Sequence, residues 1–418
     1  MIHRIRIPLI LAALAVVVFA LPVAEAQAAD LPPGGTFIDD DELLEEGWIE
    51  AIAAIGVTRG CNPPINDKYC PERTVIRGEM ASFLVRALDL PPASEDHFID
   101  DEESVHQDAI NALYEAGITK GCNPPTNDQF CPDAPTTRGE MAAFLNRAFA
   151  YPPTDGTDYF IDDNGNVFEG DIDRIAAAGI TAGCGSGKYC PRDPMLRSHM
   201  AVFLGRSLGL TPNTPTPRPH VIGEFTTYHP SGQSRVTNIH LIADAVDGAV
   251  VQPGETWSLN AHVGQRTRAK GYVAAGAIIN GELYCCDSPV NIGGGTSQFA
   301  TTLYNAIFFA GLDDVDHHPH SIYFSRYPMG REATLSWPGP DVKFRNDTQI
   351  PLTIDTSHTN TSVTVEIIGA NGRREVTAYR YGTATTSKGG TVKVKRVIKY
   401  LDGSRSTETW THRYNPLG

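Results

Sequence analysis

A short motif occurs three times in the first half of this 418-residue chain. Its residues, Phe-Ile-Asp-Asp, lie at 37–40, 98–101 and 160–163, so successive copies are 61 and 62 residues apart. A fixed period of this length predicts supersecondary units that bury their apolar faces against one another. Arrays of this kind usually hold an extended partner, which favours a binding role for residues 29–210.

Each copy is predicted to fold as a helix, a loop and a second helix, in units of about residues 33–92, 93–153 and 154–210. A glycine follows the first helix of each copy, where a left-handed residue commonly ends a helix. These glycines are Gly56, Gly117 and Gly179. The second helix carries an apolar stripe, which in the second copy is Met141, Phe144, Leu145 and Ala148. The aspartates of each motif are expected to cap the helix that follows.

The N-terminus predicts export. Arg4 and Arg6 precede an apolar run over residues 8–20, and Ala26-Gln27-Ala28 fits a cleavage site for signal peptidase. We expect residues 1–28 to be a signal peptide that is removed, with an uncleaved membrane anchor as the alternative. No later stretch is apolar for long enough to span a bilayer, so no stable transmembrane segment is expected after cleavage.

Each copy also carries a pair of cysteines in its loop. In an oxidising compartment, paired cysteines at repeated positions indicate disulfides, which would stabilise small units by ~2–3 kcal/mol each. A zinc site is the alternative, but no histidine or second cysteine pair recurs beside each pair. The predicted disulfides are Cys61–Cys70, Cys122–Cys131 and Cys184–Cys190, and no metal or cofactor is predicted. The state of the adjacent Cys285 and Cys286 is left open between a vicinal disulfide, an intermolecular bridge and free thiols.

Charge is spread unevenly along the chain. Residues 29–210 contain 31 acidic and 13 basic residues, a net charge of −18, whereas residues 211–418 contain 17 and 19, a net charge of +2. The asymmetry supports two separate units and argues against nucleic acid as a partner. Residues 211–220 are rich in proline and are predicted to be a linker.

The remainder is predicted to be α+β. Apolar spacing favours helices near residues 239–246 and 299–310, and Asn280-Gly281 favours a hairpin over residues 277–284. Alternating segments from residue 321 onward predict antiparallel strands. We place one domain at residues 221–370 and a β-rich C-terminal extension at residues 371–418.

The repeats resemble the S-layer homology (SLH) family through Phe-Ile-Asp-Asp, Gly117-Ile118-Thr119 and Thr137-Arg138-Gly139-Glu140-Met141. The resemblance implies an all-α, pseudo-threefold domain that holds a secondary cell-wall polysaccharide without a covalent bond. It places the glycan-binding residues in grooves between repeats, at Arg77, Glu79, Arg138, Glu140 and Arg197. The third copy departs from the pattern, because His199 replaces the acid. The alternative is structural: Thr137 and Glu140 form a capping box, and Arg138 pairs with a neighbour.

From about residue 225 to residue 356 the chain resembles the VanW-like family. The motifs include Pro253-Gly254-Glu255-Thr256, Gly293-Gly294-Gly295-Thr296-Ser297-Gln298 and Phe344-Arg345-Asn346-Asp347-Thr348. The resemblance implies association with the cell envelope and names no reaction.

Ser297 is the candidate nucleophile. It follows three glycines at a predicted helix start, where free backbone N–H groups could stabilise an oxyanion. His318 or His320 could act as the base, and Arg331 could hold a ligand carboxylate. The alternative is that Ser297 is only a helix N-cap. In addition, the following helix, about 18 Å long, carries both histidines away unless the chain folds back.

We therefore expect a secreted protein anchored at the cell wall by its repeats, with a second domain that binds peptidoglycan-related material. One alternative is a cell-wall-modifying enzyme that uses Ser297 and a nearby histidine for acyl transfer or hydrolysis. A structural surface-layer subunit is a further alternative.

Overall fold

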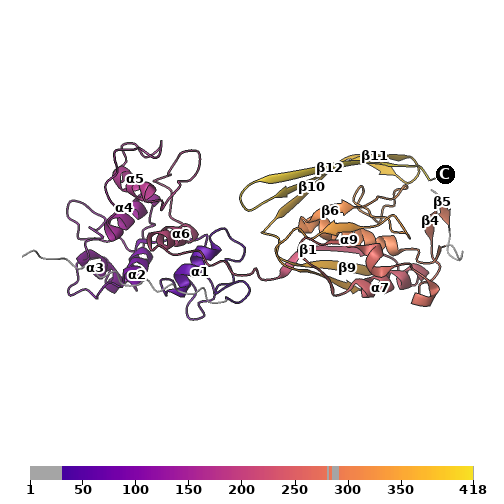
Figure 1. Cartoon of the computed structure of the whole chain (residues 1–418), viewed down its shortest axis with the longest axis horizontal. Coiled ribbons are helices and arrows are strands. Elements are labelled where there is room, and N and C mark those ends of the chain that lie inside the picture. Colours follow the sequence, from indigo (N-terminus) through magenta and orange to yellow (C-terminus); the bar gives the residue numbers. More distant parts are fainter. Residues whose placement is uncertain (1–30, 280–281, 285–290, 418) are drawn as a thin grey trace, which may run out of the picture. The chain divides into compact units, whose positions relative to one another are not determined.

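The computed structural model describes residues 31–279, 282–284 and 291–417. The predicted signal peptide, Cys285 and Cys286 lie outside these residues. Helices make up the regular structure of the repeats, whereas helices and antiparallel sheets together build the chain from residue 220 onward (Figure 1). Within the described residues, no helix combines the length and the apolar character needed to cross a membrane.

The predicted helix–loop–helix pattern of the repeats is confirmed. The helices are α1 (Glu46–Ala54), α2 (Arg77–Leu88), α3 (Gln107–Glu115), α4 (Arg138–Phe149), α5 (Glu169–Ala177) and α6 (Arg197–Ser207). The three predicted stop glycines have φ values of 71–74°, which residues with a side chain rarely adopt. The apolar stripes of the second helices are buried in a common core.

The three repeats are joined at one point by equivalent backbone hydrogen bonds. Val75 N donates to Met195 O (2.8 Å), Met195 N to Thr136 O (2.8 Å) and Thr136 N to Val75 O (2.9 Å). All three residues are fully buried, so these groups need partners within the protein. The helix contacts follow the same cycle, because α2 packs on α3, α4 on α5 and α6 on α1.

A buried arginine at the start of each second helix reaches into the next repeat. Its Nε donates to the carbonyl of an aromatic residue, and the pairs are Arg77–Phe130, Arg138–Tyr189 and Arg197–Tyr69, each at 2.8 Å. Each guanidinium carbon also lies 4.8 Å from the centre of that aromatic ring. Hydrogen bonds and cation–π contacts thus offset the cost of burying the three cations.

Two of these arginines also reach a carboxylate, and the third does not. Arg77 Nη1 lies 2.9 Å from Glu140 Oε1, and Arg197 Nη1 lies 3.4 Å from Glu79 Oε1. The matching position for Arg138 is occupied by His199, whose pKa is lowered by burial and by the charge of Arg138. Arg138 Nη2 is buried and has no hydrogen-bond partner among the described residues. The missing acid of the third copy therefore removes one ion pair between repeats.

All three predicted disulfides are confirmed, with Cα–Cα distances of 6.1 Å. The prediction that the motif aspartates cap the following helix is wrong. The N-caps of α1, α3 and α5 are Glu45, His106 and Phe168, and none of these N-termini has a side-chain capping hydrogen bond. The first aspartate of each motif has another role. Its carboxylate instead accepts hydrogen bonds from the second cysteine of the pair and the residue before it, as Asp39 does from Cys70 N (2.9 Å) and Tyr69 N (2.7 Å). This carboxylate thus holds the end of the disulfide loop against the motif.

The main sheet of the second half has the order β1-β9-β8-β2, with every neighbouring pair antiparallel. Its strands are β1 (His220–Tyr228), β9 (Ser362–Gly369), β8 (Leu352–His358) and β2 (Ala249–Val251). The two predicted helices are present as α7 (Ser234–Val246) and α9 (Thr296–Ala310), and both pack on this sheet. α9 approaches β1 closely, because a Cβ at Gly223 would lie 2.3 Å from Ala306 O.

Three further antiparallel sheets complete the described chain. They comprise β3 (Thr256–Ser258), β7 (Lys343–Arg345) and β6 (Asp313–Asp316); β4 (Ala277–Ile279) and β5 (Glu282–Tyr284); and β10 (Glu375–Thr385), β11 (Gly389–Lys399) and β12 (Arg405–Tyr414). The strands of the predicted hairpin are thus confirmed. The expectation of strands from residue 321 onward is wrong for residues 321–342, which form turns and irregular structure.

The sheet of the C-terminal residues is tied to the end of α9 by Arg396. This side chain is 1% exposed, and its guanidinium donates to Phe308 O (3.1 Å) and Leu312 O (2.9 Å). These carbonyls lie at the helix C-terminus, where intrahelical donors run out and a cation is favoured.

The unequal partners of the buried arginines predict unequal costs of removing them. We expect Arg77→Met to lower the free energy of unfolding of the repeats by about 2–3 kcal/mol, because Phe130 O loses its donor and Glu140 Oε1 loses its cation. Arg138→Met should cost about 1 kcal/mol less, because no carboxylate loses a partner. Denaturant unfolding of the two variants, followed by circular dichroism, measures the difference. Equal costs, or a larger cost at Arg138, would contradict this account.

Candidate functional sites

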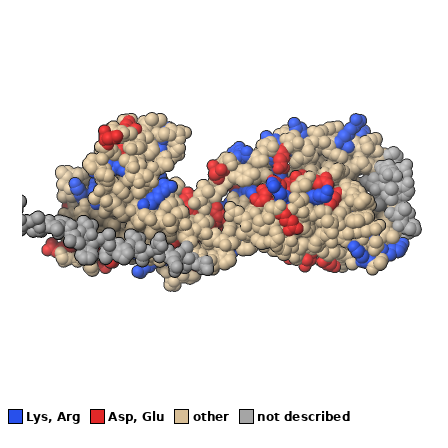
Figure 2. Space-filling view, viewed as in Figure 1, with Lys and Arg blue, Asp and Glu red and all other residues tan. Residues whose placement is uncertain are grey.

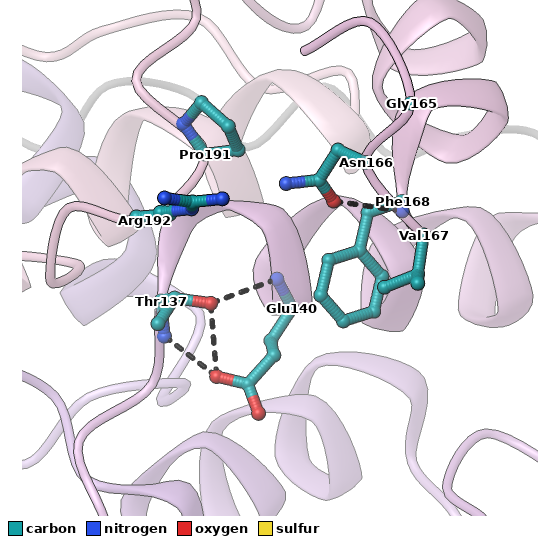
Figure 3. Close-up of a pocket in the computed structure, with 8 residues that line it drawn as sticks. All are labelled: Thr137, Glu140, Gly165, Asn166, Val167, Phe168, Pro191 and Arg192. Atoms are coloured by element: carbon teal, nitrogen blue, oxygen red, sulfur yellow. Dashed lines mark hydrogen bonds between the residues drawn. The ribbon is translucent and has the colours of Figure 1, made fainter.

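A pocket of about 460 Å³ lies at the junction of the second and third repeats (Figure 3). One wall is the start of α4, with Thr137 and Glu140. The other walls come from the third repeat, as the loop before α5 and the pair Pro191-Arg192. In Figure 3 the amide of Asn166 and the side chain of Arg192 lie on either side of the opening. The pocket therefore offers a carboxylate, an amide and a guanidinium to a polar ligand.

The capping box expected from Thr137 and Glu140 is present. Glu140 N donates to Thr137 Oγ1 (3.2 Å), and Thr137 N donates to Glu140 Oε2 (2.8 Å). Glu79 makes only half of this arrangement, because Ile76 supplies its backbone N–H and no hydroxyl.

The structure separates the predicted glycan-binding residues into two groups. Glu140 lines the pocket. The other four make contacts within the fold: Arg77, Arg138 and Arg197 are at most 6% exposed and bond to backbone carbonyls of the next repeat, and Glu79 pairs with Arg197 outside the pocket lining. Arg192, which the sequence did not single out, is exposed and lines the pocket. The sequence feature that could have pointed to Arg192 is its position two residues after Cys190, where the disulfide loop ends. Direct contact of the three buried arginines with a glycan stays a prediction.

A larger cavity, of about 1090 Å³, lies in the second half at the N-terminus of α9. Its walls come from the start of α7, the segment around residues 265–269, the glycine triplet before α9 and two loop segments within residues 320–340. The triplet has to be glycine on geometric grounds. Gly293 and Gly295 have φ of 86° and 93°, and a Cβ at Gly294 would lie 2.4 Å from Ala275 O.

The triplet is held in place from α7. Asn238 is fully buried, and its Nδ2 donates to Gly294 O (2.8 Å) and Val273 O (2.9 Å). The first-turn backbone of α9 is thereby presented at the cavity wall, where a helix favours negative charge.

Arginines dominate the polar lining of this cavity. They are Arg235, Arg266, Arg268 and Arg326, and the described lining contains no acidic residue. Arg266 is buried and donates to Asn260 Oδ1 (2.5 Å), whereas Arg268 and Arg326 are exposed. Burial lowers the pKa of Arg235, and the nearby charge of Arg326 lowers it further. With four arginines and no acidic residue in its described lining, the cavity has an excess of positive charge, which suits an anionic ligand.

Ser297 and His320 both line this cavity. The N-cap of α9 is Gly295, so the alternative assignment of Ser297 as N-cap is wrong. Ser297 Oγ instead accepts a hydrogen bond from Leu335 N (3.0 Å), which leaves its O–H proton to be donated elsewhere.

His320 is oriented by a carboxylate that the sequence did not assign. Its Nδ1 lies 3.0 Å from Oε2 of Glu332, which is fully buried and also accepts a hydrogen bond from Tyr414 Oη (3.0 Å). The ring stacks on Tyr327, with centroids 5.3 Å apart. A proton on Nδ1 is favoured by this pairing, which leaves Nε2 as the acceptor.

The other two predicted residues lie elsewhere. The His318 side chain is 60% exposed and pairs with Asp316 (3.3 Å), outside the cavity lining. The Arg331 guanidinium lies over the rings of Phe309 (4.9 Å) and Phe308 (5.3 Å), and it is also absent from the lining.

Known protein families match both the repeats and the second half of the chain. Residues 99–142, which include α3 and the start of α4, match the S-layer homology domain. Residues 234–368, which include most of the cavity lining, match the family described as VanW like protein. The chain carries an SLH domain and a VanW-like domain. An SLH domain suggests attachment at the cell surface, and a VanW-like domain suggests a role related to the cell wall.

Two curated relatives resemble parts of the chain. The uncharacterized protein YoaR of Bacillus subtilis (strain 168) is 44% identical over 134 residues, which is 32% of this chain and 43% of that protein. An endoglucanase of Bacillus sp. (strain KSM-635) is 36% identical over 83 residues, 20% of this chain and 8% of the enzyme. The chain thus spans less than half of the length of either relative.

Proposed function

We propose that the SLH repeats hold this protein non-covalently on a cell-wall polysaccharide, while the VanW-like domain binds an anionic, peptidoglycan-related component of the envelope. The observation that carries the second part is the cavity with four arginines and no acid in its described lining. In this proposal the protein is exported, and it works at the wall.

The anchoring role rests on the repeats. We propose that they form a pseudo-threefold unit with a groove at each junction, as their cyclic hydrogen bonds suggest. In the pocket between the second and third repeats, Arg192 provides a fork of donors for an acidic sugar, and Glu140 accepts hydroxyl donors. In this proposal the buried side chains of Arg77, Arg138 and Arg197 hold the walls of the grooves in place.

Anchoring is tested by sedimentation of the full chain with purified cell walls. We expect the protein to pellet with intact walls and to stay in solution after the secondary polymer has been removed chemically. Arg192→Gln should weaken retention, because it removes the exposed guanidinium from the pocket. Lys120→Gln, at an exposed position outside the pocket lining, is the control. Retention that survives removal of the polymer would rule out this anchor.

Peptidoglycan chemistry fits the cavity because its stem peptides carry carboxylates. Arginine binds a carboxylate through two parallel hydrogen bonds, and Arg268 and Arg326 are exposed to do so. The face seen in Figure 2 has acidic and basic side chains interspersed. The described lining of the cavity, in contrast, carries four arginines and no acidic residue.

Removal of cavity charge should weaken binding of soluble muropeptides. We expect Arg268→Gln and Arg326→Gln each to raise the Kd by about tenfold, as the loss of one charged hydrogen bond predicts. Arg345→Gln is the matched control, since Arg345 is exposed, pairs with Asp313 and lies outside the lining. Calorimetric titration measures the three values. Unchanged affinity in both cavity variants would contradict the proposed site.

The second candidate function is acyl transfer or hydrolysis, and the His320–Glu332 pair is the observation that favours it. In this scheme Ser297 Oγ attacks an acyl carbonyl, His320 Nε2 takes the hydroxyl proton, and Glu332 stabilises the imidazolium. The imidazolium returns this proton to the leaving amine or alcohol as its bond to the acyl carbon breaks, and water or an acceptor amine then releases the acyl group from Ser297. Thr296 N and Gln298 N already donate to Gly293 O and Gly295 O, so the scheme assigns the N–H of Ser297 to the oxyanion.

Turnover separates the two candidates. If the domain is an enzyme, muropeptides incubated with the full chain give products that are lost in Ser297→Ala and reduced by orders of magnitude in Glu332→Gln. His318→Asn is the control, because His318 lies outside the cavity lining. Binding without any product from the unaltered protein would exclude catalysis on these substrates.

A further inference from the structure

The segment that leads into α1 of the first repeat brings three carboxylates together. One oxygen from each of Asp40, Asp41 and Glu46 lies within 4.8 Å of the other two. Asp40 and Glu46 are 0% and 1% exposed, so this cluster is inside the repeat and not on its surface.

These carboxylates have oxygens without a donor. Both oxygens of Asp40, Oδ1 of Asp41 and Oε1 of Glu46 are buried and have no hydrogen-bond partner among the described residues. Buried polar atoms are nearly always paired, and a buried carboxylate without donors is costly. These four oxygens therefore need a proton or a cation to offset the cost of their burial.

The remaining oxygens of two of these side chains are fixed by donors. Glu46 Oε2 accepts from Glu42 N (2.8 Å), and Asp41 Oδ2 accepts from Arg218 Nη1 (2.7 Å). Each contact holds one oxygen of a carboxylate outside the cluster and leaves the other inside it. The cluster is thereby organised before any ligand arrives.

The pKa values of two of these carboxylates reflect the same cost of burial. Burial, with the charges of Glu50 and Glu46, raises the pKa of Asp40 to about 8. Burial likewise raises the pKa of Glu46 to about 7.

The set of acids differs in the other two repeats. The positions of Asp41 and Glu46 hold Glu102 and Gln107 in the second copy, and Asn164 and Glu169 in the third. Each of these copies replaces one ligand acid by an amide, and within the described residues the same three positions do not converge there. The first copy is distinguished from the others by this complete set.

We propose that Asp40, Asp41 and Glu46 bind a calcium ion in the first repeat. The donors are all carboxylate oxygens, which are the ligands of hard cations. Calcium accepts six to eight oxygens in irregular geometry, so Asp40 can offer both of its oxygens and water can complete the shell. This site is independent of the polysaccharide pocket and of the arginine-lined cavity.

Calorimetric titration of the EDTA-treated full chain with CaCl₂ tests this site. We expect one ion per chain and a rise in the unfolding temperature of the repeats with calcium. Asp40→Asn and Glu46→Gln should each weaken binding at least tenfold. Asp101→Asn is the matched control, because it changes the equivalent buried aspartate of the second repeat, and it should bind as the unaltered chain does.

Three results would overturn the proposal: no binding heat and no thermal shift with CaCl₂, unchanged affinity in the variants, or binding of Mg²⁺ in place of Ca²⁺. Circular dichroism checks that each variant is folded. If Asp40→Asn does not fold, Glu46→Gln decides the question. In that variant the amide oxygen takes the place of Oε2 and accepts from Glu42 N, so the amide nitrogen takes the place of Oε1 and cannot bind a cation.

Discussion

A charge removed from water needs a partner, and this requirement organises both halves of the protein. In the repeats, three buried arginines donate to carbonyls of the next repeat and lie over its aromatic rings, so each repeat is stabilised by contacts with its neighbour. In the second half, buried Arg396 donates to Phe308 O near the end of α9 and to Leu312 O just after it, and thereby holds the C-terminal sheet against the helix. Distant segments are held together because the cost of leaving these cations unpaired is high.

The same requirement explains the shape of the two candidate sites. The buried arginines of the repeats bond to the next repeat, which leaves Glu140 and Arg192 to face the pocket at the junction. In the VanW-like domain, Arg266 is tied to Asn260, whereas Arg268 and Arg326 are exposed at the cavity. Residue type alone therefore does not separate a structural arginine from a binding one. The burial of the guanidinium and the partners of its nitrogens make that distinction.

Much of the local structure was predictable, because local physics decides it. The stop glycines, the disulfides, α7, α9 and the strands of the hairpin all follow from spacing, left-handed conformations and turn chemistry. The errors arose where distant contacts decide. The first aspartate of each motif holds the disulfide loop and does not cap a helix, and residues 321–342 form irregular loops that line the cavity. The pairing of His320 with Glu332 joins two loop residues twelve positions apart, a separation with no periodic signature.

The sequence by itself determined the repeat architecture, the disulfide pattern and the two families, because period, cysteine spacing and ordered motifs are properties of the chain. Only the tertiary structure decided which charged residues remain available for function. It buried Arg77, Arg138 and Arg197, brought Ser297 and His320 to one cavity without His318, and enclosed Asp40 with Asp41 and Glu46. The physical reason is that burial and partnership arise from packing between segments far apart in the chain, and no local pattern records them.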